Sequence, residues 1–404
     1  MSNLDALYTK KQQEVLDFYY NHDFFMLINH GAKRTGKTVL DNDLFLAELM
    51  KVRQRANEDN VAEPQYILAG ATLGNVERNV LSELTNKYSL EFKFDKFNRF
   101  RLFGVLVCCF GHSTISDLGR IRGMTSYGAY INEGTMANEE VFNEIKSRCS
   151  ANGARLLIDT NPDSPEHYLK RDYIDKADGE TIAEFNYKLR DNTFLSERYI
   201  ESIIKSTPSG MFTDRDINGE WVTAEGVVYQ DFDAKFNYVY DLKKYEFVNF
   251  FCGVDWGYEH FGCICLFGET ADGTIVLIKE WSAKHRDINY WLNIARGIKG
   301  AYGNVPFYCD SARPEHLATF LENGINTFGA NKAVLSGIEV VATLLKTRKL
   351  LIYYPNVSLF RREIYKYIWN EKTGEPVKQD DDCMDTIRYA IYSRVAPGGF
   401  EILK

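Results

Sequence analysis

The stretch Gly31-Ala32-Lys33-Arg34-Thr35-Gly36-Lys37-Thr38 matches the pattern G-x-x-x-x-G-K-[ST] at every fixed position. An apolar run at 24–28 precedes it and an amphipathic stretch at 40–50 follows it, which predicts a strand, a loop and a helix in that order. In this context the N–H groups of the loop face the phosphates of a nucleotide, and the helix directs its positive N-terminal end at the same oxygens. The stretch therefore predicts a site for a nucleoside triphosphate.

Each fixed residue of this phosphate loop has a physical role. Gly31 and Gly36 let the backbone curl around the phosphates, because glycine tolerates conformations that other residues avoid. Lys37 is expected to reach the terminal phosphates of ATP, and Thr38 to place its hydroxyl on Mg²⁺.

Other residues near the loop are further candidates for the nucleotide site. Lys33 and Arg34 are additional cations beside the transferred phosphoryl group, and either acts in cis like an arginine finger or is simply solvated. Gln12 or Gln13, ahead of the first strand, is a candidate for reading the adenine edge.

Hydrolysis also needs acids at the end of a neighbouring strand. The run 127–133 supplies such a strand and ends in Asn132 and Glu133. Glu133 is the candidate catalytic carboxylate, and Asn132 stands where an aspartate is usual, so an amide would hold a magnesium-bound water less strongly. Alternatively, the pair only opens the helix that follows. The next strand ends in Asp159-Thr160-Asn161-Pro162, where Asn161 and its threonine neighbour can sense the γ-phosphate.

The order of predicted elements divides the 404 residues into two parts, as the length also suggests. Alternating strands and helices predict a P-loop domain of the RecA or ASCE type, with a mainly parallel α/β sheet, over 1–206. An irregular connection at 207–246 follows, and three hairpin-linked strands, a helix, a strand and a helix over 247–404 have the order of a ribonuclease-H-like mixed sheet. The predicted strands are 66–69, 105–110, 130–131, 156–158, 247–254, 263–267, 275–281 and 306–309, and the predicted helices 75–84, 139–148, 287–298 and 314–321.

Composition limits the classes of function. A net charge of −8 argues against a uniformly basic nucleic-acid coat, although a local groove can still be basic. The eight cysteines show no C-x-x-C spacing and are expected to be reduced, buried thiols of a cytosolic protein. Residues 1–17 have no apolar signal core and no run is long enough to span a bilayer, so we expect no membrane partner.

Three acids in the second half follow buried strands or open a helix. Asp255 and Asp310 each end an apolar strand, and Asp385 opens the final helix. A shared metal site is one interpretation, because two-metal phosphodiester hydrolysis requires carboxylates from separate segments. An acid of this kind standing alone is more often a strand-end turn or a helix cap.

The ordered motifs together resemble the large terminase subunit of tailed double-stranded DNA bacteriophages. The resemblance covers nearly the whole chain and rests on the phosphate loop, 130–133, 160–162, 219–221, 254–257, 309–312 and 384–390. It implies a translocating ATPase, with ATP and Mg²⁺, joined to a nuclease that uses Mg²⁺ or Mn²⁺, with two ions expected. By position, Lys37, Thr38, Glu133 and Asn161 would run hydrolysis and coupling, whereas the metal ligands would be Asp255, Asp310 and Asp385. Asp382 stands where many relatives carry a histidine, so its role in the metal site is open.

The resemblance also implies partners and a location. We expect double-stranded DNA, a small terminase subunit and the portal protein of the procapsid as partners. A homo-oligomeric ring is expected on the portal and a monomer in isolation, in the cytoplasm of the infected host and not in the mature virion. The alternatives are a helicase-like repair or recombination ATPase with a non-catalytic second domain, and an assembly protein that binds ATP without hydrolysing it.

Overall fold

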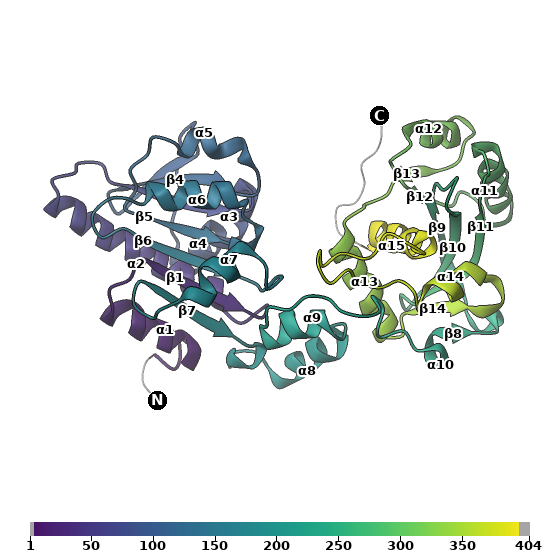
Figure 1. The fold of residues 1–404 in the computed structure, drawn as a ribbon, viewed down its shortest axis with the longest axis horizontal. Helices are drawn as coiled ribbons and strands as arrows, with labels where there is room; N and C mark the ends of the chain where they lie inside the picture. The colour runs from purple at the N-terminus through teal and green to yellow at the C-terminus, as the bar shows by residue number, and fades with distance from the viewer. Residues whose placement is uncertain (1–3, 396–404) are drawn as a thin grey trace. The chain divides into compact units, whose positions relative to one another are not determined.

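The computed structural model describes residues 4–395 and divides the chain into two compact units (Figure 1). The first unit runs to Ile204 and includes Thr213–Val222, whereas the second comprises Lys205–Phe212 and the described chain from Thr223 onward. The chain therefore changes unit three times between 204 and 223, where the sequence suggested one connection at 207–246. No helix in the described part of the chain is long and apolar enough to cross a bilayer.

The first unit is built on a seven-stranded sheet with the order β3-β4-β2-β5-β6-β1-β7. All neighbouring strands are parallel except β3 and β4, which are antiparallel. The strands are β1 (Met26–Gly31), β2 (Gln65–Gly70), β3 (Arg99–Leu102), β4 (Val105–Gly111), β5 (Gly128–Asn132), β6 (Arg155–Thr160) and β7 (Ile182–Tyr187).

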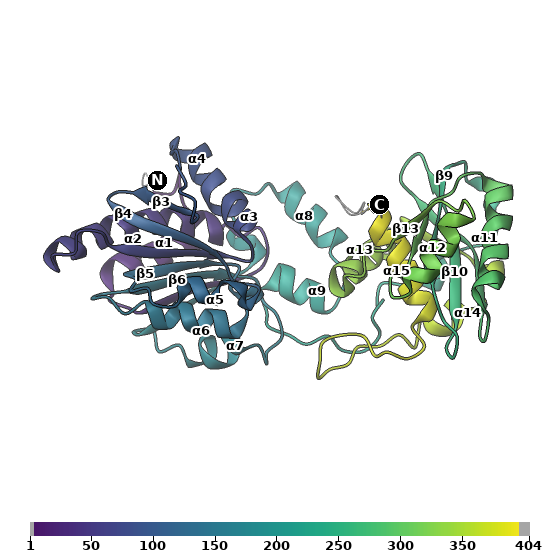
Figure 2. The ribbon, with the colours of Figure 1, turned by 90° about the horizontal axis from the view of Figure 1, so that it is seen from above.

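Helices cover both faces of this sheet (Figure 2). Leu27 of β1 lies in a core with α1 (Lys10–Asn21) and α2 (Lys37–Glu58), whereas its neighbour Ile28 lies in a core with α6 (Glu139–Arg148) and α7 (Tyr168–Asp172). Alternate residues of a strand thus bury into opposite layers, as a doubly covered parallel sheet requires. The remaining helices of this unit include α3 (Leu73–Val76), a π-helical turn (Glu77–Leu81), α4 (Ser82–Tyr88), α5 (Leu118–Ile121) and most of α8 (Glu197–Ser206).

The segment Thr213–Val222 packs against the strand that leads into the phosphate loop. Trp221 is buried and its indole Nε1 donates to Nδ1 of His30 at 3.1 Å. Nε2 of the same imidazole lies 2.7 Å from the Glu184 carboxylate on β7. Gly219 has a φ of 73°, and a Cβ there would lie 2.5 Å from the carbonyl oxygen of Tyr187, so only glycine fits.

The second unit has its own seven-stranded sheet, in the order β13-β12-β9-β10-β11-β14-β8. Strands β9, β10 and β11 are antiparallel, and β12 joins the other edge of β9 in parallel. This is the order of ribonuclease-H-like sheets. The strands are β8 (Tyr238–Val239), β9 (Phe247–Asp255), β10 (Gly262–Thr270), β11 (Ile275–Ala283), β12 (Phe307–Cys309), β13 (Thr327–Gly329) and β14 (Leu350–Tyr353).

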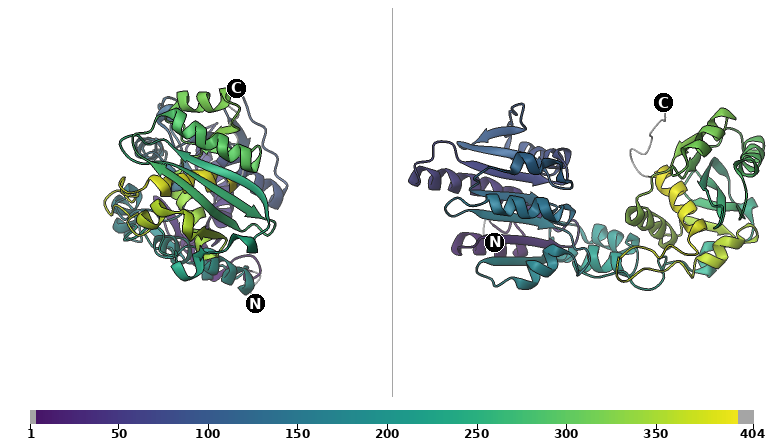
Figure 3. Two further views of the ribbon diagram at one scale, coloured as in Figure 1. Left: turned by 90° about the vertical axis from the view of Figure 1, so that its right-hand side faces the viewer. Right: turned by 45° about the horizontal axis from the view of Figure 1, so that its top comes forward.

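Helices also cover both faces of the second sheet (Figure 3). One layer holds α11 (Ile288–Tyr302) and α12 (Pro314–Glu322), whose Trp291 and Phe320 are buried against the sheet. The other layer holds α13 (Val334–Lys346) and α15 (Asp382–Val395), with α14 (Ser358–Glu363) beside α15 and β11. A short helix, α9 (Met211–Thr213), begins in this unit, and α10 (Ala234–Asn237) lies near β14. Helix α15 crosses β9 at Gly253, where a Cβ would lie 2.4 Å from the Thr386 carbonyl oxygen.

Candidate active sites

The phosphate loop connects β1 to α2 as the sequence predicted. Gly31 has a φ of 132° and a Cβ there would lie 2.1 Å from the carbonyl oxygen of Tyr187, whereas Gly36 is the left-handed N-cap of α2. Lys37 Nζ donates to the carbonyl oxygens of Gly31 at 2.9 Å and Ala32 at 2.6 Å. Burial lowers the pKa of Lys37 to about 8. The lysine is thus folded back onto carbonyls that would compete only weakly with phosphate.

A cavity of about 250 Å³ opens in front of this loop. It collects residues from the ends of β1, β5 and β6, because parallel strands present their carboxyl ends at one edge of a sheet. Of the candidates from the sequence, the structure brings together Lys33, Arg34, Gly36, Lys37, Thr38, Asn132, Glu133 and Asn161 in its lining. Asn161 Oδ1 accepts from Lys37 Nζ at 3.2 Å, so the predicted sensor touches the lysine that would bind phosphate.

The two loop cations differ in their surroundings. Lys33 is exposed, and its Nζ lies 2.7 Å from the Asp216 carboxylate. Arg34 is exposed in a left-handed conformation with a φ of 60°, and its guanidinium lies 5.9 Å from the centroid of the Tyr199 ring. Lys33 therefore has a carboxylate partner, whereas the guanidinium of Arg34 lies near an aromatic ring.

Gln12 lies against the backbone of the phosphate loop. Its Nε2 donates to the Gly36 carbonyl oxygen at 2.9 Å, and its Oε1 accepts from the Thr9 N–H at 2.8 Å. The side chain is buried and does not line the cavity in front of the loop. The adenine role of Gln12 stays a prediction, and in this structure both ends of its amide hold backbone groups, those of Gly36 and Thr9.

Glu133 stands directly after β5 in a strained backbone conformation. Its φ of 58° is left-handed, which is uncommon for a non-glycine residue and concentrates at functional sites. The carboxylate accepts from Nδ2 of Asn75 at 3.2 Å. Burial, with the negative charge of Asp159 beside it, raises the pKa of Glu133. This carboxyl is therefore a better proton acceptor than an exposed glutamate.

Asp159 is a candidate functional residue for which the sequence alone predicted no role. Its carboxylate is buried at the end of β6, where the Thr38 hydroxyl and the Asn132 amide both donate to it. The backbone N–H of Glu133 donates to the same carboxylate at 3.0 Å. Burial raises the pKa of Asp159, and these donors oppose that effect. The hydroxyl and carboxylate oxygens together form the hard donor set that suits Mg²⁺, so the residues fit a magnesium-bound nucleotide.

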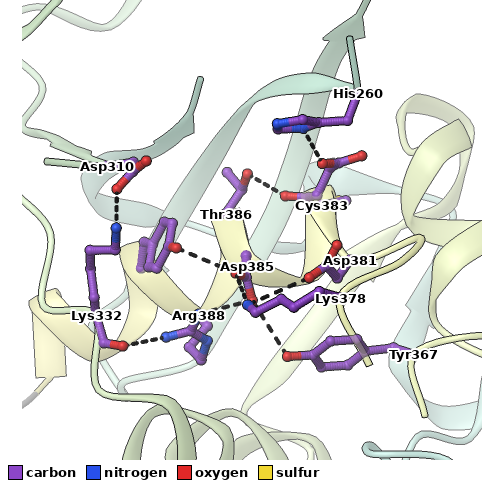
Figure 4. Close-up of polar contacts among 12 residues, drawn as sticks. His260, Asp310, Lys332, Tyr367, Lys378, Asp381, Cys383, Asp385, Thr386 and Arg388 are labelled. Carbon is purple, nitrogen blue, oxygen red and sulfur yellow. Dashed lines mark hydrogen bonds and ion pairs between the residues drawn. The ribbon is translucent and has the colours of Figure 1, made fainter. Parts of the chain in front are cut away.

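The three predicted acids of the second unit lie at one end of β9, β12 and α15, and Figure 4 shows two of them with their partners. Lys332 Nζ lies 2.6 Å from the Asp310 carboxylate. Asp385 is held by Arg388 at 2.8 Å and by Lys378 at 3.1 Å (Figure 4). Although burial acts to raise the pKa of Asp385, these two cations hold it below its usual value.

Asp255 has a different environment. Burial raises its pKa well above the usual value, and the negative charges of Asp310 and Asp385 act in the same direction. Ligand atoms of Asp255, His260 and Asp382 all lie within 4.8 Å of one another, and His260 Nδ1 lies 2.7 Å from the Asp382 carboxylate. Clustered carboxylate oxygens are the donors that Mg²⁺ and Mn²⁺ prefer, so this set fits a divalent cation.

The sequence reading also missed His260 and the cations of this site. Asp382, which the sequence analysis noted as standing where many relatives carry a histidine, lies directly beside His260. An exposed histidine two residues after Tyr258 gave no local signal, because the loop between β9 and β10 brings it to α15 only in the fold. A cavity of about 600 Å³ with Asp255, His260, Asp382 and Asp385 in its lining opens here.

The family described as "Terminase large subunit, T4likevirus-type, N-terminal" matches residues 30–236. The large terminase of a thermophilic bacteriophage is similar in structure, with a TM-score of 0.81 and 26% identity over 96% of this chain and 98% of that one. The complexes of that terminase with ATP-γ-S and with ADP each give a TM-score of 0.79 at 26% identity, covering 95% of this chain and 98% and 99% of theirs. Among curated proteins, no significant match is found.

Fold and sites define an α/β enzyme in which a P-loop ATPase domain is joined to a ribonuclease-H-like nuclease domain. Within this class, the chain belongs to the large terminase subunit family.

Proposed function

We propose that this protein drives double-stranded viral DNA into procapsids by hydrolysing ATP, and cuts concatemeric DNA with a metal-dependent endonuclease. The observation that carries the proposal is the presence of two chemically different sites in one large-terminase chain. One is a phosphate-loop cavity lined by the candidate catalytic carboxylate of Glu133, and the other is a cluster of acids on a ribonuclease-H-like sheet. The complexes of the similar thermophilic-phage terminase with ATP-γ-S and ADP support a nucleotide at the first site.

At the ATPase site, the side chains divide the work of phosphoryl transfer to water. Lys37 would exchange the carbonyl oxygens of Gly31 and Ala32 for the terminal phosphates. Glu133, with its raised pKa, would orient the attacking water and accept its proton, while Asn161 would report the state of the γ-phosphate to the loop. Bound Mg²⁺ would neutralise charge on the β- and γ-phosphates.

At the nuclease site, Asp255, Asp310 and Asp385 would hold two Mg²⁺ or Mn²⁺ ions. These ions would supply an activated water and charge neutralisation for cleavage of a phosphodiester. Asp310 and Asp385 would first have to part from Lys332 and Lys378, because each lysine now lies on the carboxylate. Asp382 would contribute an oxygen beside Asp255.

The proposed partners follow from the same function: a small terminase subunit, the portal protein and double-stranded DNA, in the cytoplasm of the infected host and outside the mature virion. A net charge of −8 predicts that one copy binds DNA weakly and with strong salt dependence. A ring of copies on the portal would offset weak binding through multivalency.

The test separates the two activities. Lys37→Ala should abolish ATP hydrolysis yet keep plasmid cleavage with Mn²⁺, whereas Asp255→Ala should do the reverse. Melting curves for both variants establish that each is folded. Loss of both activities in either folded variant would contradict the two-site proposal.

A second candidate, a helicase-like repair ATPase whose second domain is not catalytic, makes the opposite prediction. It requires ATP-dependent strand separation and no cleavage by the wild type with either Mg²⁺ or Mn²⁺. The gathering of three acids at one end of the second sheet favours the nuclease, since a non-catalytic domain would have no use for them.

A further inference from the structure

We propose that Asp159, at the end of β6, supplies the carboxylate that supports Mg²⁺ at the phosphate loop, and that Asn132 is an amide because its role is to hold that carboxylate. This inference rests on the proposed ATPase function and names a positioning pair for it. It explains why the residue before Glu133 lacks the acid that the reaction needs.

The sheet order places Asp159 closer to the loop than Asn132. Strand β6 lies between β5 and β1, so the end of β6 is the immediate neighbour of the strand that enters the loop. In register, Asp159 pairs with Asn132 on one side and with Asn29 of β1 on the other. A carboxylate at 159 is therefore one strand nearer to Thr38 than a carboxylate at 132 would be.

The hydrogen bonds show which side chain acts as the acid. The Thr38 hydroxyl donates to Asp159 and not to Asn132. Asn132 Nδ2 lies 2.9 Å and 3.1 Å from the two carboxylate oxygens of Asp159. The amide oxygen of Asn132 accepts from Nδ2 of Asn79 at 3.0 Å, which fixes the amide with its N–H groups toward Asp159.

The two positions are complementary in charge. An aspartate at 132 beside Asp159 would place two buried carboxylates in contact, and like charges at this distance cannot both stay ionised. An asparagine at both positions would leave the Thr38 hydroxyl facing only an amide. One aspartate and one asparagine at positions 132 and 159 avoid both problems, whichever position holds the aspartate. This chain carries the aspartate at 159, on β6.

Asp159 is held by uncharged donors, so its negative charge remains for a cation. Its direct partners are a hydroxyl, an amide and a backbone N–H, whereas Lys37 Nζ is turned to loop carbonyls and to Asn161. The Thr38 hydroxyl that is expected to meet Mg²⁺ already touches this carboxylate. Two oxygen donors for the metal shell are thus in contact before any nucleotide binds.

The experiment compares wild type, Asp159→Asn, Asn132→Asp and the double exchange Asn132→Asp/Asp159→Asn. Calorimetry measures ADP affinity in EDTA and in Mg²⁺ for each folded protein, and melting curves report stability. We expect Asp159→Asn to bind ADP in EDTA as tightly as the wild type does. The increase in ADP affinity that Mg²⁺ produces should be about 10- to 100-fold smaller in this variant than in the wild type. Asn132→Asp alone should melt at a lower temperature, because it brings two buried carboxylates together.

The double exchange should regain part of the Mg²⁺-dependent affinity that Asp159→Asn loses, which a purely structural role of Asp159 does not predict. Asp41→Asn is the matched control, since Asp41 is another buried acid near the lysine and accepts from Asn29. It should leave the Mg²⁺ gain unchanged. If Mg²⁺ increased ADP affinity in Asp159→Asn as much as in the wild type, or if the double exchange recovered none of the loss, the inference would be overturned. The proposed ATPase function would still stand. If Mg²⁺ did not increase the ADP affinity of the wild type, both the inference about Asp159 and the proposed ATPase function would be overturned.

Discussion

The phosphate-loop site and the acid cluster of the second unit hold buried carboxylates in opposite ways. Asp159 is surrounded by neutral donors, which stabilise its charge without cancelling it. Asp310 and Asp385 are paired with lysine and arginine, which do cancel their charge. The first site is therefore ready for a cation as it stands, whereas the second must exchange protein cations for metal ions. The difference predicts that metal binding at the two sites changes in different ways when the residues that contact the carboxylates are replaced.

The largest effect on cleavage and stability should come from a substitution that forces α15 away from β9. In Gly253→Ala the new Cβ would lie 2.4 Å from the Thr386 carbonyl oxygen and 2.8 Å from the Ala390 Cβ, so the helix must move away from the strand. Overpacking of this kind costs roughly 1–3 kcal/mol. We expect the variant to lose plasmid cleavage and to melt earlier, while its ATPase activity stays close to that of the wild type.

The control for this variant is Gly297→Ala on α11. A Cβ there meets nothing within 4 Å, and alanine in a helix is favoured over glycine by about 1 kcal/mol. This change should keep cleavage and leave stability equal or higher. Cleavage that survives in Gly253→Ala would show that Asp255 and Asp385 need not be held by this close crossing.

The second prediction concerns the lysines on the acid cluster. Lys332→Ala and Lys378→Ala each remove a cation that competes with a metal ion for a carboxylate. Mn²⁺ affinity, measured by calorimetry, should rise by roughly tenfold, equivalent to ~1.4 kcal/mol of relieved repulsion. Lys349→Ala, whose lysine pairs with Asp272 in the β10–β11 turn, should leave Mn²⁺ affinity unchanged. Weaker Mn²⁺ binding in the two site variants would contradict the competition.

The third prediction uses the pKa of Glu133. Asn75 donates to this carboxylate and so lowers its pKa, against burial and the charge of Asp159, which raise it. In Asn75→Ala the pKa should rise further, so that protonation of Glu133 begins at a higher pH. The acid limb of the ATPase kcat/KM profile should then move up by roughly 0.4–1 pH unit, the equivalent of one hydrogen bond. Asn86→Ala, an exposed change on α4, should not move the limb.

The smallest effect should be a proton taken up on nucleotide binding. Burial holds the pKa of Lys37 at about 8, and phosphates beside it would raise that pKa. Calorimetry of ADP binding at pH 8 in buffers of different ionisation enthalpy should show uptake of up to about half a proton, and almost none at pH 6. Lys33→Ala should retain the uptake because Lys33 is exposed. Proton release at pH 8 would contradict this assignment.

Local patterns were sufficient to predict most strands and many of the residues that line the two candidate sites. Glu133 and Asp255 each follow a buried apolar run, which is a signal that a single sequence carries. Strand β7 was missed because it is an edge strand whose Glu184 and Asn186 break the apolar pattern. The predicted helix 40–50 proved to be α2, Lys37–Glu58, because its charged last turns hide the period.

What the sequence could not show depends on strand order and on contacts between distant segments. Asp159 follows an apolar run as Asp255 does, but its meeting with Thr38 follows only from β6 lying beside β1. His260 reaches Asp382 across 122 residues of sequence. Gln12 is a buried brace of the loop, a role that no local pattern distinguishes from a surface glutamine.

The return of Thr213–Val222 to the first unit matters for anyone who truncates this protein. A fragment that stops near residue 206 would remove Trp221 from His30 and uncover the strand that carries the phosphate loop. It would also remove Gly219 from its place against Tyr187. A self-sufficient N-terminal fragment therefore has to extend through Val222, even though the chain has by then already passed once through the second unit.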